Sequence, residues 1–332
     1  MKAAVVTSFG TVPRYRDFPC PEDGGTVIDV IAAGLHPRVR SQADGSHYTS
    51  TGELPLVPGI DGVGRGPDGL LRYFILPDVR LGAMAEQTVI DLRRSIVLPE
   101  DSDPIAVAAA MNPAMSSWLA LRQRVAFQPG QNVLVLGATG NAGRMAVQVA
   151  RLLGAGQVIA AGRDAGRLAA LPGLGATGTV PLDGEAATVA QRLGQAATDA
   201  DVVIDYLWGA PAAAAMVALV TGRADRGQLL TWIQIGSVAG PAAPVSSAAL
   251  RAARLQIVGS GQGSVSPRDI LAELPALARE ITRGTFAVDA RPTPLAEVER
   301  AWADTPHTTQ RIVLTPATAI RSSRWRSLSG SR

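Results

Sequence analysis

The chain has 332 residues, of which 47% are apolar and 18% charged, so it can bury about two cores and is not a disordered protein. The net charge of +3 comes from residues 317–332, which hold four arginines and no acid. The nearly neutral remainder indicates no nucleic-acid-binding face. One cysteine, Cys20, excludes an internal disulfide framework and a zinc site built on several thiolates.

No apolar run approaches the 18 residues of a membrane-spanning helix, and the chain starts with a strand pattern rather than a signal peptide. We therefore expect a soluble, cytoplasmic protein without a membrane partner. Residues 317–332 are expected to form a basic, flexible tail.

The first third of the chain has the pattern of short strands separated by turns. Residues 54–66 are dense in glycine and proline, which predicts tight turns around a short strand. Asp103 followed by Pro104 is typical of a helix start, and that helix is expected over 106–111. Apolar and β-branched runs predict further strands at 2–7, 26–32 and 85–90.

From about residue 130 strands and helices alternate, which predicts an α/β fold with a doubly wound parallel sheet. The continuous apolar run 132–136 is typical of a strand buried on both faces. Further strands are expected at 157–161, 179–182, 201–207, 228–235 and 255–259. Helices are expected at 141–153, 167–171, 186–197, 211–220 and 246–253. Two more helices at 270–283 and 295–303 and a closing strand at 311–314 complete the pattern.

The strongest motif joins the buried strand to the next helix through a glycine turn, Gly-Ala-Thr-Gly-Asn-Ala-Gly, at 137–143. Gly140 would let the backbone approach a pyrophosphate, and Gly143 would let the helix pack against the strand. The free N–H groups and positive dipole end of the helix favour phosphates. A plain structural turn is the alternative, but the strand–turn–helix context favours a dinucleotide site.

The second strand of this region ends at Gly162 and Arg163, followed by Asp164. NAD sites usually have an acid at this strand end, which holds the ribose 2′-hydroxyl. Glycine and arginine instead leave room for a 2′-phosphate and supply a guanidinium, and Arg167 would add a second charge. The pattern favours NADPH; a solvated surface arginine, or an Asp164 turned inward onto the ribose, is the alternative.

Seven segments, taken in order and spacing, resemble one family, the medium-chain dehydrogenase/reductase superfamily in its zinc-independent quinone oxidoreductase branch. The resemblance covers residues 1–314. The segments are Ala-Ala-Gly-Leu-His-Pro (32–37), Leu-Pro-Leu-Val-Pro-Gly-Ile-Asp-Gly-Val-Gly (54–64), Met-Ala-Glu-Gln (84–87), the glycine turn (137–143), Asp-Val-Val-Ile-Asp (201–205), Ile-Gly-Ser (235–237) and Arg-Ile-Val-Leu (311–314).

The resemblance implies an α/β protein with two domains. A GroES-like β domain for substrate and catalysis would comprise 1–115 and 262–316, and a Rossmann domain that binds NADPH would comprise 116–261. The implied activity is hydride transfer from NADPH to a quinone or to the C=C of an α,β-unsaturated carbonyl (an enone). Family members often pair through the last Rossmann strand, so a homodimer is expected.

The resemblance also implies where the cofactor lies, along the carboxyl ends of the Rossmann strands. The pyrophosphate would lie at Thr139, Gly140, Asn141 and Ala142. The adenosine phosphate would lie at Gly162, Arg163 and Arg167. The ribose and nicotinamide side would be lined by Leu207, Trp208, Gly236, Ser237, Gly259, Ser260 and Gly261. Trp208 is equally suited to be a core aromatic. Ser116 and Ser117 would face the nicotinamide or cap a helix.

Two side chains are candidates for the chemistry. His36 would project toward the nicotinamide, where it would hydrogen-bond a substrate carbonyl or protonate the reduced product; the alternative is a satisfied structural histidine. Tyr48 would lie in a loop at the mouth of the site, as a proton donor or substrate contact. Zinc-dependent relatives have ligands at the positions of His36, Ile60 and Asn112. Isoleucine cannot ligate and an amide is a poor donor, so no metal is expected.

Two other functions stay open. One is an NADPH-binding sensor or structural protein without turnover, because His36 and Val39 replace the Asn and Asp of quinone reductases and the stretch 66–81 is shorter than usual. The other is a specialised biosynthetic enzyme on the same scaffold, without net redox change.

Overall fold

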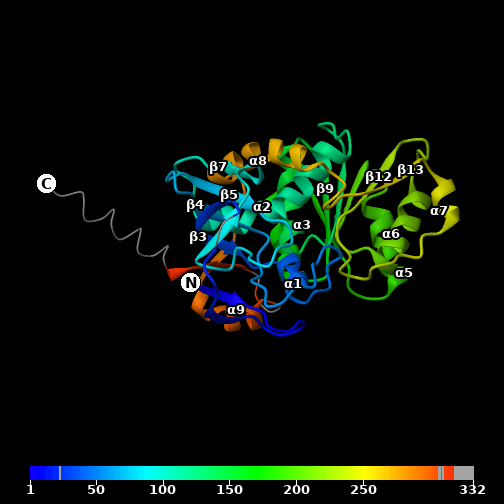
Figure 1. Cartoon of the computed structure of the whole chain (residues 1–332). Coiled ribbons are helices and arrows are strands. Elements are labelled where there is room, and N and C mark those ends of the chain that lie inside the picture. Colours follow the sequence, from blue (N-terminus) through cyan, green and yellow to red (C-terminus); the bar gives the residue numbers. More distant parts are fainter. Residues whose placement is uncertain (22–23, 306–307, 309, 318–332) are drawn as a thin grey trace. The chain divides into compact units, whose positions relative to one another are not determined.

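The computed structural model describes residues 1–21, 24–305, 308 and 310–317 (Figure 1). Two compact units divide the chain, Met1–Asn112 with Leu271–Arg332, and Pro113–Ile270; we call the second the Rossmann unit. The boundaries expected from the sequence, after 115 and 261, differ from these by three and nine residues. Apart from Ala317, the expected tail lies outside the described residues.

The first unit is built on a seven-stranded mixed sheet with the order β14-β15-β3-β4-β5-β7, in which β6 also pairs with β3; β1 and β2 form a separate pair. In the long strand β3 (Thr26–Gly34), Ile28, Val30 and Ala32 are buried, so the apolar alternation of the sequence marks its core face. The other strands are β1 (Lys2–Val5), β2 (Arg14–Asp17), β4 (Asp61–Arg65), β5 (Leu71–Ile75), β6 (Gln87–Ile90), β7 (Ser95–Val97), β14 (Ala290–Pro294) and β15 (Arg311–Thr315).

The Rossmann unit contains a six-stranded, all-parallel sheet with the order β10-β9-β8-β11-β12-β13. Because the chain starts at β8 in the middle and proceeds first to one side and then to the other, the sheet is doubly wound, which confirms the predicted fold class. Its strands are β8 (Val133–Leu136), β9 (Val158–Gly162), β10 (Gly178–Pro181), β11 (Val202–Asp205), β12 (Leu230–Gln234) and β13 (Leu255–Gly259).

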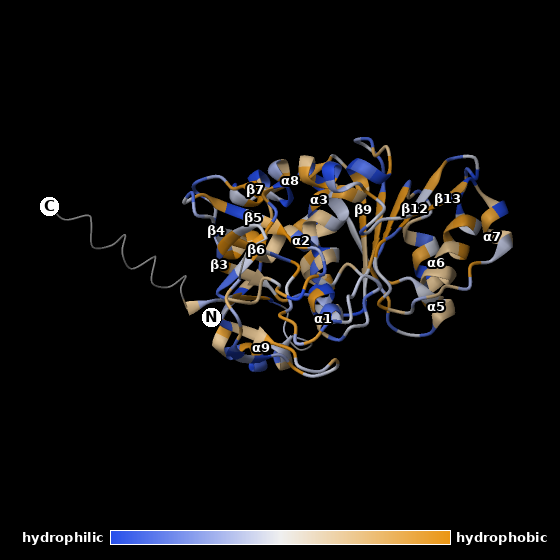
Figure 2. Cartoon of the chain, viewed as in Figure 1, coloured by the Kyte–Doolittle hydropathy of each residue, from blue (hydrophilic) through white to orange (hydrophobic). Residues whose placement is uncertain are grey.

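The core of the Rossmann unit explains the continuous apolar runs of its strands. Leu134, Val203 and Trp232 are fully buried and cluster with Met216 and Leu219 of the helix Gly209–Gly222. Figure 2 shows the strands near the labels β9 and β12 in orange, the colour of hydrophobic residues. The connecting helices are α3 (Asn141–Leu152), α4 (Ala165–Ala170), α5 (Ala186–Ala196), α6 (Gly209–Gly222) and α7 (Ser247–Ala252).

The remaining helices are α1 (Pro37–Ala43), α2 (Pro104–Leu119), α8 (Pro267–Thr282) and α9 (Val298–Asp304). A π-helical turn, Ala120–Arg124, continues α2, so this helix is much longer than the expected 106–111. The combined stretch Pro104–Arg124 is long and apolar enough to cross a bilayer by composition, but 67% of its apolar window is buried within the protein, as in a core helix.

Candidate functional site

The glycine turn forms an open cradle at the start of α3. Gly140 is the residue before the helix and has no side chain to cap it, so the first N–H groups of α3 stay available to a ligand. A Cβ at Gly140 would meet only the Gly137 oxygen, at 3.5 Å, whereas a Cβ at Gly143 would lie 2.2 Å from that oxygen. Gly143 is therefore required for packing, and Gly140 leaves space above the helix for an anion.

Around this cradle, Thr139, Asn141 and Ala142 are half-buried and Gly140 is exposed. The space beside Gly162 is filled, because a Cβ there would lie 2.3 Å from the Thr139 side chain. Gly162 is therefore needed for the packing of the turn against β9. The space for a 2′-phosphate that was expected beside Gly162 is not found there.

Two charged side chains follow the end of β9, an exposed arginine and an aspartate that caps the next helix. Arg163 is exposed at the carboxyl end of the strand. Asp164 caps α4 by accepting from the Arg167 N–H at 2.9 Å, and it also lies 3.4 Å from the Arg167 guanidinium. Arg167 additionally donates to the Thr139 carbonyl at 3.3 Å. Asp164 is therefore engaged as the cap of α4, and an inward turn onto a ribose would have to break that cap.

The chain turns sharply after β11 around one buried carboxylate. Asp205 accepts from the N–H groups of Leu207 and Trp208 at 2.8 and 2.9 Å and from the Trp232 indole at 2.9 Å. This explains why β11 ends at Asp205 instead of the predicted 207. Burial raises the pKa of Asp205, while these three donors act in the opposite direction. Trp208 has a φ of 54°, a left-handed value that a non-glycine residue rarely adopts.

Tyr206, which the sequence analysis did not single out, lies in the same turn. Its hydroxyl is 2.8 Å from Ser116 Oγ, and burial raises the pKa of Tyr206 to about 12, so the phenol stays protonated. Ser116 and Ser117 donate to the carbonyls of Pro113 and Ala114, three residues earlier in α2. They therefore face Tyr206 from within the helix and do not cap it.

The ends of β12 and β13 complete this edge of the sheet. The Gln234 side chain donates from Nε2 to the Gly236 carbonyl at 3.0 Å, and the Ser260 N–H donates to the Gln234 carbonyl at 2.8 Å. Gly259 accepts from Arg124 Nε at 2.9 Å. Since the strands are parallel, all predicted cofactor residues gather at one sheet edge, the carboxyl edge, which is where ligands of such sheets bind. The predicted cofactor residues that are exposed at this edge are Gly140, Arg163, Ser237, Gly259 and Gly261.

His36 lies buried in the first unit, directly before α1, and is only 1% exposed. Its Nε2 is 3.0 Å from Asp61, which also accepts from the Tyr73 hydroxyl at 2.7 Å. Since a carboxylate only accepts, Nε2 carries the hydrogen and Nδ1 is an acceptor with no partner among the described residues. Burial lowers the pKa of His36, against the opposing effect of Asp61.

Arg311 belongs to the same buried cluster. It donates to the Leu35 carbonyl at 3.0 Å, and burial lowers its pKa to about 10 although the Asp61 charge raises it. The sequence pattern indicates no partner for His36, because Asp61 and the Tyr73 that donates to it are distant in the chain. The Asp61 signal was present, however, in the Pro-Gly-Ile-Asp segment of the family resemblance. His36 as a group that acts on substrate stays a prediction.

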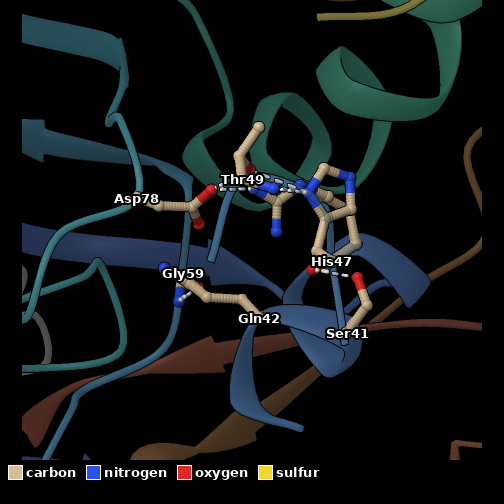
Figure 3. A network of polar contacts seen from close by, with 7 residues as sticks. Ser41, Gln42, His47, Thr49, Gly59 and Asp78 are labelled. Atoms are coloured by element: carbon tan, nitrogen blue, oxygen red, sulfur yellow. Dashed lines mark hydrogen bonds and ion pairs between the residues drawn. The ribbon is translucent and has the colours of Figure 1, made fainter. Parts of the chain in front are cut away.

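Tyr48, the second catalytic candidate, is 75% exposed and stacks on His47 at 4.2 Å between ring centres. His47 Nδ1 is 2.8 Å from Thr49 Oγ1. The Thr49 hydroxyl in turn donates to the Asp78 carboxylate and accepts a hydrogen bond from the Arg38 guanidinium. Figure 3 shows Asp78, Thr49 and His47 in one line. This network fixes the loop that carries Tyr48, while His36 lies in a separate, buried environment.

A small pocket lies beside that loop, with a cavity volume of ≈ 10 Å³. This is room for about one water molecule, so the pocket does not compete with the sheet edge as a dinucleotide site. Its lining residues are Phe9, Gln42, Ser50, Thr51, Gly52, Leu56, Asp78 and Val79. Over residues 1–21, 24–305, 308 and 310–317, no three His, Cys, Asp or Glu side chains gather as metal ligands, and Ile60 is buried in the apolar core.

Comparison with known proteins identifies relatives of this chain. No family model matches. "Probable NADPH-dependent quinone reductase tdiC" of Emericella nidulans is 31% identical over 360 residues, covering 95% of this chain and all of that protein. The quinone oxidoreductase of Homo sapiens is 30% identical over 181 residues, covering 50% of this chain and 54% of the human protein.

Among solved structures, a mycobacterial protein in complex with NADPH matches with a TM-score of 0.77 and 24% identity, over 95% of this chain and all of that chain. At this identity the match establishes the fold.

Proposed function

Because the chain belongs to the medium-chain dehydrogenase/reductase superfamily, in its quinone oxidoreductase-like branch, we propose that it is an NADPH-dependent reductase of quinones or of the C=C bond of α,β-unsaturated carbonyls. A relative that is matched over its whole length carries the description "Probable NADPH-dependent quinone reductase". A partly matching relative from Arabidopsis thaliana is described as an NADPH-dependent alkenal/one oxidoreductase, which supports the enone alternative.

The uncapped helix start above Gly140, next to an exposed Arg163, is the observation that carries this proposal. The residues present fit NADPH: the N–H groups of α3 would hold the pyrophosphate, and Arg163 would pair with the 2′-phosphate. Asp164, held in its helix cap, does not place an acid against that phosphate. When bound, NADPH supplies the hydride.

The protein's own groups would bind and orient the cofactor and the substrate. The Asp205 carboxylate holds the turn that presents Tyr206, Leu207 and Trp208 at the sheet edge. His36 is kept neutral by burial, so it would serve first as a hydrogen-bonding group. A proton taken up at Nδ1, which has no partner in the part of the chain that the structure describes, would be stabilised through Nε2 by Asp61.

The proposal is tested by binding first and turnover second. NADPH binding is measured by calorimetry, and NADPH consumption is then followed with a panel of quinones and enones. Gly140→Ala is the informative variant, because φ at Gly140 is −77° and the nearest atom to a new Cβ is 3.5 Å away. The fold should tolerate it, while the phosphate approach is blocked.

Gly173→Ala is the matched control, since a Cβ there meets nothing within 4 Å and the residue lies outside the site. Loss of NADPH binding in Gly140→Ala and not in Gly173→Ala is expected. Binding without consumption of NADPH by any acceptor would favour a sensor or a redox-neutral enzyme and would contradict the proposed reductase.

We also propose that the enzyme is zinc-independent. Support comes from Ile60, which is apolar and buried where zinc-dependent relatives have a ligand, and from the single thiol of the chain. Metal analysis of protein purified without added zinc should give well under one equivalent. A stoichiometric zinc whose removal abolishes activity would refute the proposal.

A further inference from the structure

Tyr206 lies at the topological switch point of the parallel sheet, where the strand order reverses on either side of β8. β9 lies on one side of β8 and β11 on the other, and ligands of such sheets bind in the crevice at this switch point. Tyr206 is the first residue after β11, and a Cβ at Gly137, in the turn after β8, would lie 3.3 Å from the Tyr206 Cβ. The tyrosine side chain therefore starts at the crevice.

The backbone of Tyr206 is fixed from two directions. A Cβ at Gly236 would lie 2.7 Å from the Tyr206 carbonyl oxygen, so only glycine lets the chain after β12 approach so closely. On the other side, the Asp205 carboxylate holds the N–H groups of Leu207 and Trp208. A side chain supported in this way is preorganised and loses little freedom when a ligand binds.

The Tyr206 hydroxyl faces two serines of α2 that already have acceptors of their own. Ser116 donates to the Pro113 carbonyl at 2.8 Å, and Ser117 donates to the Ala114 carbonyl at 3.2 Å. Either hydroxyl can be the donor in the 2.8 Å contact between Tyr206 and Ser116 Oγ. While both serine hydrogens stay on these carbonyls, Tyr206 is the donor in that contact, and the lone pairs of its oxygen are left to accept from a ligand.

The sheet order decides which half of the dinucleotide reaches this oxygen. With the pyrophosphate at the start of α3 and the adenosine phosphate at Arg163, after β9, the other half extends over β11. The N–H donor in that half is the carboxamide of the nicotinamide ring. We propose that the Tyr206 oxygen accepts a hydrogen bond from this carboxamide and thereby orients the ring. This inference rests on the proposed NADPH function and adds a cofactor-binding residue to it.

The test pairs one substitution with one change in the cofactor. Tyr206→Phe removes the oxygen and keeps the ring. Calorimetry then measures the dissociation constants of NADPH, of its thionicotinamide analogue, which keeps the N–H donor, and of its 3-acetylpyridine analogue, which has none. The variant should bind the first two about two- to tenfold more weakly and the third with unchanged affinity. Tyr15→Phe, in β2, is the matched control and should bind all three like the wild type.

The wild type alone provides a second measurement, because the acetylpyridine analogue should bind to it more weakly than NADPH by a similar factor. Equal losses for all three cofactors in Tyr206→Phe would assign the tyrosine a structural role or a contact with the ribose hydroxyls, and would overturn the inference. Unchanged NADPH affinity in the variant would overturn it too. A wild type that binds no NADPH would refute the proposed function itself.

Discussion

The left-handed backbone at Trp208 predicts an unusual order of stability for two variants. Its φ of 54° and ψ of −160° lie in a region that essentially only glycine adopts without strain. Trp208→Ala and Trp208→Gly both remove the indole, so they lose the same ring contacts with the apolar core. They differ in the Cβ, which keeps the strain in the alanine variant and is absent in the glycine variant.

The magnitude follows from two opposing effects. Strain of this kind costs about 1–3 kcal/mol, and glycine instead of alanine destabilises by about 0.4–1 kcal/mol through the greater freedom of the unfolded chain. Trp208→Gly should therefore be more stable than Trp208→Ala by about 0.5–2 kcal/mol. Urea unfolding monitored by the fluorescence of the remaining tryptophans measures the difference.

Val217 provides the matched control, since it is 42% exposed within α6. There the order should reverse, with Val217→Gly less stable than Val217→Ala by about 1 kcal/mol. If Trp208→Ala is as stable as Trp208→Gly or more so, the strain argument is wrong.

Three further expectations concern the cofactor, the buried histidine and the assembly. Arg163→Ala should weaken NADPH about tenfold or more and leave NADH nearly unchanged; equal losses for both cofactors, measured by calorimetry, would show that this strand end was misread. Burial lowers the pKa of His36 below its ordinary value of 6.5, so the unfolded chain takes up the proton first and the free energy of unfolding falls as the pH drops below 6.5. His36→Gln cannot titrate, and its Nε2 amide stands in the place of the imidazole Nε2 that bonds to Asp61, so urea unfolding at about pH 7.5 and 5.5 should show a smaller fall than in the wild type; an identical fall would rule out His36 as its source. We also propose a homodimer through β13, the edge strand of the Rossmann sheet, and a monomer in light scattering at micromolar concentration would contradict this.

Local patterns predicted the glycine cradle well. Gly140 and Gly143 are read from spacing within a few residues, and the apolar run before them identifies a buried strand, so the turn and α3 follow without knowledge of the rest of the chain. β13 was placed at its observed bounds for the same reason.

Contacts between distant residues were beyond the sequence patterns. Asp61 lies 25 residues from His36, and Tyr73 belongs to β5, a strand that the analysis did not predict. β2, α1, β7 and β14 were missed as well; α1 has seven residues and the three strands only three to five, too few to show a period.

The turn after β11 shows why a pattern can mislead about a site. The apolar run continues to Leu207, which favours a longer strand, but the Asp205 carboxylate binds the next two N–H groups and turns the chain. Tyr206 was therefore taken as part of a strand, although it lies at the switch point of the sheet. A positive φ at a tryptophan cannot be predicted from the sequence, since glycine is the usual signal for that backbone conformation.

The helix cap formed by Asp164 also limits how this protein's coenzyme preference can change. The acid that an NAD site requires is only one residue away from the usual position, yet it accepts the Arg167 N–H and fixes the start of α4. Moving it to a ribose would release a cap whose loss destabilises by about 1 kcal/mol. An evolutionary or engineered route to NADH therefore has to introduce a new carboxylate at Arg163 and leave its neighbour in place, which sets two acids side by side. Coenzyme choice and local helix stability are in this way linked through a single side chain.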